Sequence, residues 1–303
     1  MLIKRLSYGL SGANVELRQS NNELFIRKKA TTASQSRLLR RQAEIMQCWD
    51  SKSINIPTII QTGKDDFGNF FIDMDYIEGD SFSHYIANPN ILNSKHQWAF
   101  AEMLLMHMRN NLNYDCEADS CVPLYSQLIE KLDSLSEKLL GNYEHNIVIK
   151  NTIKRLNDCI VCKKNIINDL ILAPQANTVH GDLSLSNIIV TCDELYFIDP
   201  IDHYLGKCIL ADYFKLLFDL DFKLSFRVEG HYKLLEASVL INISRFIFAL
   251  TDLYSKKFHA LSAVQSIFLA IEALRVLQYS YHDNELSSSL MHYVQLKVND
   301  FDI

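Results

Sequence analysis

The sequence predicts an α+β protein in two parts, a small β-rich lobe followed by a larger and mainly helical lobe. The chain has 303 residues, which is enough for about two domains or lobes. Up to residue 78, short runs alternate apolar and polar side chains between turn-forming residues, a pattern typical of β-hairpins. Beyond Gly79, apolar residues mostly recur at the spacing of an α-helix.

The composition is that of an ordinary folded protein, with 48% hydrophobic and 22% charged residues. A formal net charge of -6 gives no overall attraction to phosphate backbones, so we expect no nucleic-acid partner. No stretch approaches the roughly 18 uninterrupted apolar residues of a membrane span. The beginning of the chain lacks the apolar region of a secretory signal, and we therefore expect a cytoplasmic protein without a membrane span.

The small lobe is predicted over residues 1–78. Two runs, 15–18 and 24–28, flank the turn-forming residues 19–22 and predict a hairpin. A second hairpin is predicted from 59–62 and 70–77 around the turn at 65–69. Between the hairpins, residues 34–49 predict an amphipathic helix capped by serine or threonine.

The large lobe is predicted over residues 79–303, after a hinge between Tyr76 and Gly79. Two β-like runs at 188–191 and 194–198 interrupt its helices. The predicted helices cover 94–111, 125–140, 147–172, 234–255, 260–281 and 285–298.

The seven cysteines are odd in number and scattered, which favours reduced thiols over a disulfide framework. Cys159 and Cys162 have the spacing of a metal knuckle or redox pair. No second such pair or histidine cluster completes a four-ligand site, and two cysteines three residues apart on a helix share a face without any special role. The sequence does not indicate an oligomeric state.

The segment His180-Gly181-Asp182-Leu183-Ser184-Leu185-Ser186-Asn187 carries the strongest chemical signal. It leads into the first of the two β-like runs, and the second run ends at Ile198-Asp199-Pro200. The hairpin brings the side chains of Asp182, Asn187 and Asp199 together at its open end, opposite the turn. Phosphoryl transfer to a hydroxyl needs such groups: oxygen ligands for Mg²⁺ and a further carboxylate for the acceptor's proton. The alternative is that these are ordinary turn residues.

These motifs resemble the aminoglycoside phosphotransferase and choline kinase-like branch of the protein-kinase fold. That branch has His-Gly-Asp in its catalytic loop, and the step from Asp182 to Asn187 reproduces the loop's spacing. The resemblance implies a two-lobed protein-kinase-like fold that uses ATP and Mg²⁺ to phosphorylate a small hydroxylated acceptor. It implies that Asp182 is the catalytic base, that Asn187 and Asp199 hold the metal, and that His180 braces the loop.

Residues 183–187, Leu-Ser-Leu-Ser-Asn, are most similar to phosphotransferase-like proteins met in bacterial surface-polysaccharide gene clusters. In the same resemblance, residues 7–14 lie where a loop covering the nucleotide belongs. Gly9 and Gly12 would let the backbone approach phosphates, and Ser11 would add a donor. A plain β-turn explains this segment about as well.

The resemblance also requires a phosphate-binding lysine at the end of the following strand. Lys28 shares a strand face with Leu24 and Ile26, so it is the first candidate, and Arg27 is the second. A solvated basic strand end is the alternative. Glu44 is the acidic residue of the next predicted helix, so we expect an ion pair with Lys28; an exposed glutamate is the alternative.

Residues 74–79 resemble the kinase hinge, with Met74 as gatekeeper. The resemblance implies that Asp75 and Ile77 contact the adenine edge through their main chains and that Tyr76 points away. Asp212 would cap the helix that follows Asp199 and brace the catalytic loop.

Asp202 and His203 are close enough to Asp199 in sequence to line the acceptor site. About a dozen residues separate Asp199 from Asp212, with no Ala-Pro-Glu, which disfavours a protein kinase. A nucleotide-binding pseudokinase that scaffolds other enzymes is the alternative to a small-molecule kinase.

Overall fold

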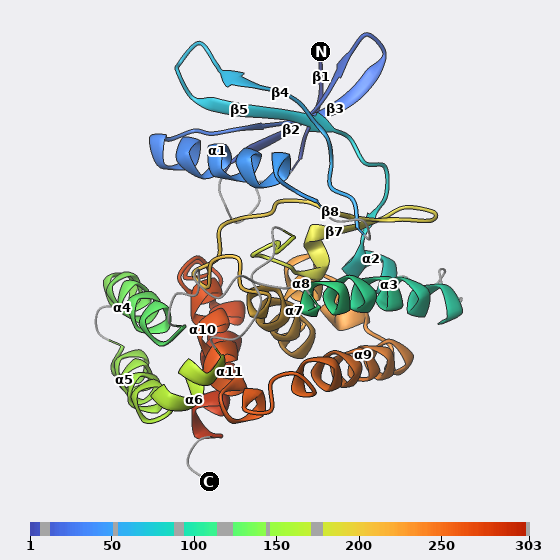
Figure 1. The fold of residues 1–303 in the computed structure, drawn as a ribbon. Coiled ribbons are helices and arrows are strands. Elements are labelled where there is room, and N and C mark those ends of the chain that lie inside the picture. The colour runs from blue at the N-terminus through green and yellow to red at the C-terminus, as the bar shows by residue number, and fades with distance from the viewer. Residues whose placement is uncertain are drawn as a thin grey trace. The chain divides into compact units, whose positions relative to one another are not determined.

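The computed structural model describes residues 1–6, 13–50, 54–87, 94–113, 124–143, 146–170 and 178–300. The chain forms two compact units, one from residues 1–107 with 177–202 and one from 108–176 with 203–303. The first contains an antiparallel sheet and the second is mainly helical (Figure 1), which confirms the predicted α+β class. The assignment of nucleotide binding to residues 1–78 and of catalysis and acceptor binding to 79–303 stays a prediction.

The main sheet of the first unit has five antiparallel strands in the order β1-β2-β3-β5-β4. Both predicted hairpins are present, and the β1 strand, which was not predicted, pairs with β2. The strands are β1 (Leu2–Leu6), β2 (Asn14–Ser20), β3 (Glu23–Lys29), β4 (Ile59–Lys64) and β5 (Phe70–Asp75).

The turn between β2 and β3 fixes the register of β3. Asn21 and Asn22 both have positive φ values, 50° and 66°, as a two-residue hairpin turn requires. Ser20 then pairs with Glu23, and the register continues without a bulge to Asn14 and Lys29.

Helix α1 (Ala33–Gln47) covers one face of this sheet (Figure 1). It begins at Thr32, whose hydroxyl accepts the backbone N–H of Gln35 at 3.2 Å, as the predicted serine or threonine cap requires. Apolar residues of the helix pack on β5 in a core of Ala30, Leu39, Ala43, Met46, Ile72 and Met74.

A smaller sheet in the same unit includes the strand that follows the predicted catalytic loop. It consists of β6 (Asp80–Ser81), β7 (Ile188–Val190) and β8 (Leu195–Phe197), in that order. Asn55, in the segment between α1 and β4, bridges to β8: it donates to the Leu195 carbonyl and accepts from the Phe197 N–H at 2.8 Å. Helices α2 (Phe82–Ala87) and α3 (Ser94–Leu112) follow β6 in the chain.

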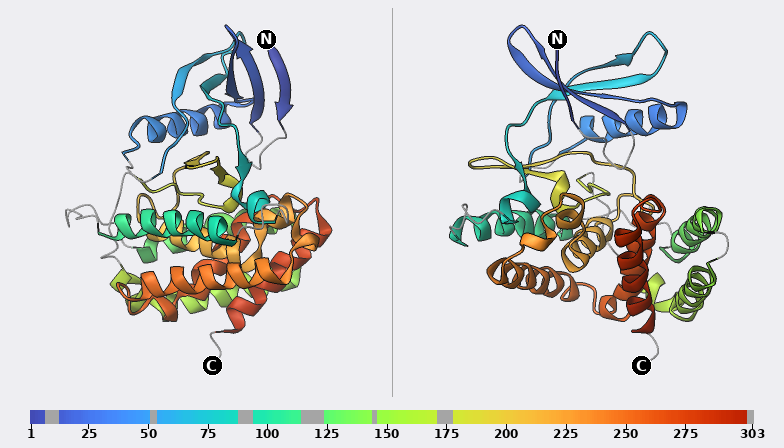
Figure 2. Two further views of the ribbon diagram at one scale, coloured as in Figure 1. Left: turned by 90° about the vertical axis from the view of Figure 1, so that its right-hand side faces the viewer. Right: turned by 180° about the vertical axis from the view of Figure 1, so that it is seen from behind.

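The second unit is built from helices, and Figure 2 shows α4 and α5 lying side by side. Helices α10 and α11 pack together, and nearly every residue of α7 is buried. Its helices are α4 (Leu124–Asn142), α5 (Ile147–Cys162), α6 (Lys164–Asp169), α7 (Leu210–Phe222), α8 (Leu224–Val228), α9 (Ala237–Ser255), α10 (Gln265–Leu277) and α11 (Asn284–Asn299).

Three details of this unit bear on the sequence predictions. The predicted helix over 147–172 is divided at Lys163, so Cys159 and Cys162 lie in the last turn of α5, and neither forms a disulfide. Asp212 lies inside the first turn of α7, whose N-cap is Ile209, so the predicted capping role is wrong.

Among the described residues, α9 is the helix long and apolar enough to cross a membrane, which by itself is weak support for a span.

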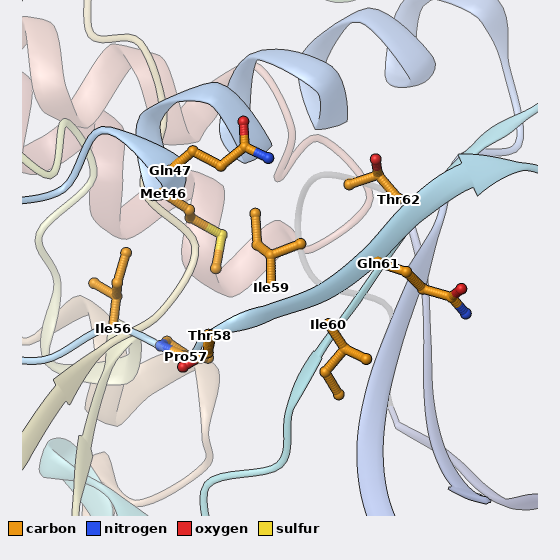
Figure 3. Close-up of a pocket in the computed structure, with 9 residues that line it drawn as sticks. All are labelled: Met46, Gln47, Ile56, Pro57, Thr58, Ile59, Ile60, Gln61 and Thr62. Atoms are coloured by element: carbon orange, nitrogen blue, oxygen red, sulfur yellow. The ribbon is translucent and has the colours of Figure 1, made fainter.

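A hollow of about 550 Å³ opens beside the edge strand β4 (Figure 3). It is lined by Met46 and Gln47 of α1 and by residues 56–62. None of the predicted site residues that the structure describes contributes to its lining.

Gly79 provides a test of how the chain enters the smaller sheet. A Cβ atom at this position would lie 2.3 Å from the Val190 carbonyl oxygen, which is backbone and cannot move away cheaply. We therefore expect Gly79→Ala to lower the free energy of unfolding by about 1–3 kcal/mol, as overpacking does. Gly141, in α4, has open space around it, and Gly141→Ala should raise stability by up to about 1 kcal/mol. Urea unfolding of both variants measures this, and equal effects would contradict the close approach at Gly79.

Candidate active site

The predicted catalytic loop, residues 180–187, is held in place by alternate buried side chains. Leu183 and Leu185 are fully buried and anchor the segment that ends in a short 3₁₀ turn, Leu185–Asn187, before β7. Gly181 has a φ of 79°, in the left-handed region that glycine adopts without strain. The loop thus turns sharply at Gly181 and presents Asp182 directly afterwards.

His180 links the loop to the end of β8. Its Nδ1 accepts the backbone N–H of Asp182 at 3.2 Å, so the ring proton lies on Nε2. Nε2 in turn donates to the Ile198 carbonyl at 2.7 Å, and the His180 carbonyl accepts from the N–H of Ile201 at 2.9 Å. His180 is fully buried. One imidazole therefore ties the backbone beside Asp182 to the backbone beside Asp199, in keeping with its predicted bracing role.

Asn187 is oriented by Asp182. Its Nδ2 donates to the Asp182 backbone carbonyl at 2.9 Å and to the Asp182 carboxylate at 3.2 Å. Both partners accept hydrogen bonds, so this orientation of the carboxamide is the one that satisfies them. The carbonyl oxygen Oδ1 is left for another partner.

Asp199 follows β8 in a left-handed conformation, with a φ of 64°. Few residues adopt this conformation, although aspartate does so more readily than most. Such a conformation persists where its surroundings determine it, and it is common at functional sites. Here the neighbouring residues Ile198 and Ile201 are both hydrogen-bonded to His180.

Lys28 reaches Asp199, and Arg27 does not. Lys28 pairs with Ile72 across the sheet, is buried, and forms an ion pair with Asp199. Arg27 lies on the opposite face, where it makes two contacts of 2.6 and 2.5 Å with the Asp73 carboxylate. That carboxylate holds the pKa of Arg27 above its usual value. The register of β3 thus distinguishes the two candidates that the sequence left open.

The predicted ion pair between Glu44 and Lys28 is not formed. Glu44 is exposed and pairs with Arg41 at 2.7 Å. The reason is helical period: α1 buries positions 39, 42, 43 and 46, and residue 44 falls outside that stripe. The spacing of apolar residues in α1 would have excluded Glu44.

Gln42 occupies the inward position instead. Its buried side-chain amide donates to the carbonyl of Pro200, the residue after Asp199, at 3.2 Å. Arg41 reaches the same segment at Asp202, with a contact of 2.6 Å. Sequence reasoning missed Gln42, although the buried stripe of α1 contains it.

The segment predicted as the hinge, residues 74–79, lies within the first unit. Met74 is buried in the core, and the backbone N–H of Asp75 donates to the Thr58 carbonyl at 3.0 Å. Ile77 lies between β5 and β6, and its backbone N–H donates to no group in the described part of the chain. Contacts of Asp75 and Ile77 with adenine stay a prediction. Gly9, Ser11 and Gly12 lie outside the described residues.

A cluster of aromatic rings that sequence reasoning missed packs beneath the site. Phe197 is fully buried and contacts His180, His107 and Trp49 edge-on, with centroid distances of 5.5, 5.2 and 6.0 Å. Burial and the neighbouring His180 lower the pKa of His107 to about 4, so His107 is neutral at pH 7. The rings support β8, the strand that precedes Asp199.

The two residues predicted to line an acceptor site have different surroundings. Asp202 is half exposed and paired with Arg41. His203 is buried and contacts Glu272 at 3.2 Å. Their role toward an acceptor stays a prediction.

The oxygen atoms at the site fit Mg²⁺. Asp199 and Asn187 offer a carboxylate and a carboxamide oxygen, both hard ligands, and Asp199 already holds a cation in Lys28. No three His, Cys, Asp or Glu side chains in the described ranges are grouped to hold a metal. The set therefore suits Mg²⁺ carried mainly by the phosphates of a nucleotide, not an all-protein cage.

The role of His180 gives a stability test. In His180→Ala, the Asp182 N–H and the Ile198 carbonyl lose their partner in a buried setting, and each such group costs about 1–3 kcal/mol. We expect a loss of about 2–5 kcal/mol in the free energy of unfolding, because two groups are affected. His292→Ala, at an exposed position, is the control and should cost less than about 0.5 kcal/mol. Similar losses in the two variants would show that His180 does not brace the loop.

Comparison with known proteins identifies the fold of this chain. No family model matches the chain, and a search of curated proteins gives no match. The solved structure of an aminoglycoside phosphotransferase, a thermostable mutant of APH(4)-Ia, is similar with a TM-score of 0.64 and 10% identity, covering 98% of this chain and 94% of that one. An ethanolamine kinase of Plasmodium vivax is similar with a TM-score of 0.55 and 12% identity, covering 98% and 81%. A glucosamine kinase is similar with a TM-score of 0.50 and 11% identity, covering 94% and 76%. The chain has the protein-kinase-like fold of the aminoglycoside phosphotransferase and choline kinase group.

Proposed function

We propose that this protein is an ATP-dependent kinase that phosphorylates a hydroxyl group of a small molecule such as a sugar, an amino sugar or a polyol. One observation carries the proposal. A single compact unit contains Asp182, which contacts Asn187, and Asp199, which contacts Lys28, and His180 links the two pairs through the backbone of Asp182 and Ile198. These groups are the ones that phosphoryl transfer to a hydroxyl requires.

In the proposed reaction, Asp182 accepts the proton of the acceptor hydroxyl as its oxygen attacks the γ-phosphorus. The new bond joins the acceptor oxygen to the γ-phosphorus, and the bond between that phosphorus and the β–γ bridging oxygen breaks to release ADP. Asn187 holds the Asp182 carboxylate in place through Nδ2. Lys28, which is paired with Asp199 here, would turn to the α- and β-phosphates when the nucleotide binds.

Asp199 and the Oδ1 atom of Asn187 would hold Mg²⁺, which neutralises charge on the phosphate oxygens when bound. Among the similar structures, APH(4)-Ia was solved in a ternary complex with AMP-PNP and hygromycin B. This supports a nucleotide and a small acceptor as the two ligands of this protein. The resemblance of residues 183–187 supports an acceptor destined for a surface polysaccharide.

A pseudokinase that binds a nucleotide without turnover is the second candidate. The observation that favours it is the position of Glu44, which pairs with Arg41 and leaves Lys28 without the acidic partner on α1 that the sequence predicted.

We expect the purified protein to form ADP from ATP and Mg²⁺ when supplied with the correct member of a panel of sugars, amino sugars and polyols. Asp182→Asn should reduce turnover by about 10²–10⁴-fold, because it removes the proton acceptor. Asp193→Asn, in the exposed turn between β7 and β8, is the matched control and should keep wild-type turnover. A coupled assay for ADP measures both variants.

Nucleotide binding is measured separately by thermal unfolding. Mg-ATP at a hundredfold excess over its Kd stabilises a binding protein by about 2.7 kcal/mol. Stabilisation without ADP formation from any acceptor would support the pseudokinase. Full turnover by Asp182→Asn would exclude the proposed role of Asp182, and the absence of both stabilisation and turnover would exclude a kinase.

A further inference from the structure

Gln42 is a polar side chain in an otherwise apolar stripe of α1. The stripe that packs on the main sheet buries positions 39, 42, 43 and 46, and its other members are Leu39, Ala43 and Met46. Gln42 itself is only 5% exposed. A buried carboxamide costs free energy unless it is hydrogen-bonded, and an apolar residue of similar size, such as methionine, would fill the position without that cost. The presence of glutamine here therefore calls for an explanation other than packing.

The side chain of Gln42 reaches the segment that follows Asp199. Its Nε2 donates to the Pro200 carbonyl at 3.2 Å, in a buried setting. Proline has no backbone N–H, so this carbonyl is the one polar main-chain group that Pro200 offers. Arg41 contacts Asp202 in the same segment, but both of these side chains are about half exposed, and exposed ion pairs contribute little to stability. Gln42 is thus a buried link from α1 to this segment, within one compact unit.

Asp199 lies between two points at which the backbone is held. On one side, the Ile198 carbonyl accepts from His180 at 2.7 Å, and on the other side the Pro200 carbonyl accepts from Gln42. The φ of Asp199 is 64°, a sparsely populated conformation that persists where the surroundings determine it. Because His180 belongs to the predicted catalytic loop and Gln42 to α1, two separate elements determine the backbone at Asp199.

We propose that Gln42 is a positioning residue for the metal: by holding the Pro200 carbonyl, it keeps the Asp199 carboxylate in the orientation that binds Mg²⁺. The proposal rests on the proposed function, in which Asp199 is a metal ligand. Gln42 acts through Pro200 and not by binding the metal, so its effect is on metal affinity and not on the nucleotide as such. Helix α1 thereby acts on Asp199 and not on Lys28, for which the sequence predicted a partner on this helix.

The test is a calorimetric titration of the full-length protein with AMP-PNP, once with Mg²⁺ and once with EDTA. The ratio of the dissociation constant in EDTA to that in Mg²⁺ measures how much the metal adds to nucleotide affinity. We expect Gln42→Met to reduce this ratio by about 10–100-fold, as the loss of a group that orients a metal ligand typically does. Affinity in EDTA should not fall, because no metal is then bound to Asp199.

Three further variants separate this role from a purely structural one. Gln47→Met is the matched control, because Gln47 lies on the same helix and is exposed, and it should keep the wild-type ratio. Gln42→Asn keeps the carboxamide but is one methylene group shorter, so it should also lower the ratio, and it serves if Gln42→Met does not fold. In an Asp199→Asn background, Gln42→Met should cause no further reduction, because the ligand on which Gln42 acts is already weakened.

An unchanged ratio in Gln42→Met, equal losses in Mg²⁺ and in EDTA, or the full additional loss in the Asp199→Asn background would overturn the role of Gln42. ADP formation by the same protein would then leave the kinase function intact. If the ratio depends on Gln42 but no acceptor yields ADP, the kinase function is wrong and the role of Gln42 stands. A wild-type protein that binds AMP-PNP no better with Mg²⁺ than with EDTA would overturn both.

Discussion

The two hydrogen bonds of the His180 ring are the constraint on which the rest of the site depends. They join the backbone at Asp182 to the backbone at Ile198, so the proposed base and the proposed metal ligand are fixed relative to one another by a single buried side chain. The ring is itself held by Phe197, which packs on His107 and Trp49. The spacing between two carboxylates is thus set by a core and not by the carboxylates themselves, which would repel one another.

The main sheet and α1 contribute to the same arrangement from the other side. Lys28 reaches Asp199 because the register of β3 turns it toward α1, and Gln42 holds the carbonyl of the next residue, Pro200. The predicted partner of Lys28, Glu44, instead pairs with Arg41 on the exposed side of α1. Asp199 is the carboxylate that pairs with Lys28. A nucleotide phosphate that took the place of Asp199 beside Lys28 would leave the Asp199 carboxylate able to bind a metal.

What could be predicted from the sequence depended on how far apart in the chain the contacting residues lie. Asp182, Asn187 and Asp199 flank one hairpin, so local spacing was enough to bring them together. The choice between Lys28 and Arg27 stayed open because it depends on pairing with β5, more than 40 residues later, and that pairing was not known from the sequence. Gln42 could have been recognised from the buried stripe of α1, whereas the contact of His203 with Glu272 spans 69 positions and leaves no local signal. The two-residue strand β6 was missed because pairing with β7, and not its own composition, defines it.

The most direct test of this account is diffraction from a crystal grown with Mn²⁺ and a non-hydrolysable ATP analogue, recorded at a wavelength where manganese scatters anomalously. The account predicts a metal peak bound by the Asp199 carboxylate and by Oδ1 of Asn187, with Lys28 moved from Asp199 to the phosphates. A bound nucleotide whose metal touches neither Asp199 nor Asn187, or a Lys28–Asp199 pair that stays intact beside the bound nucleotide, would contradict it.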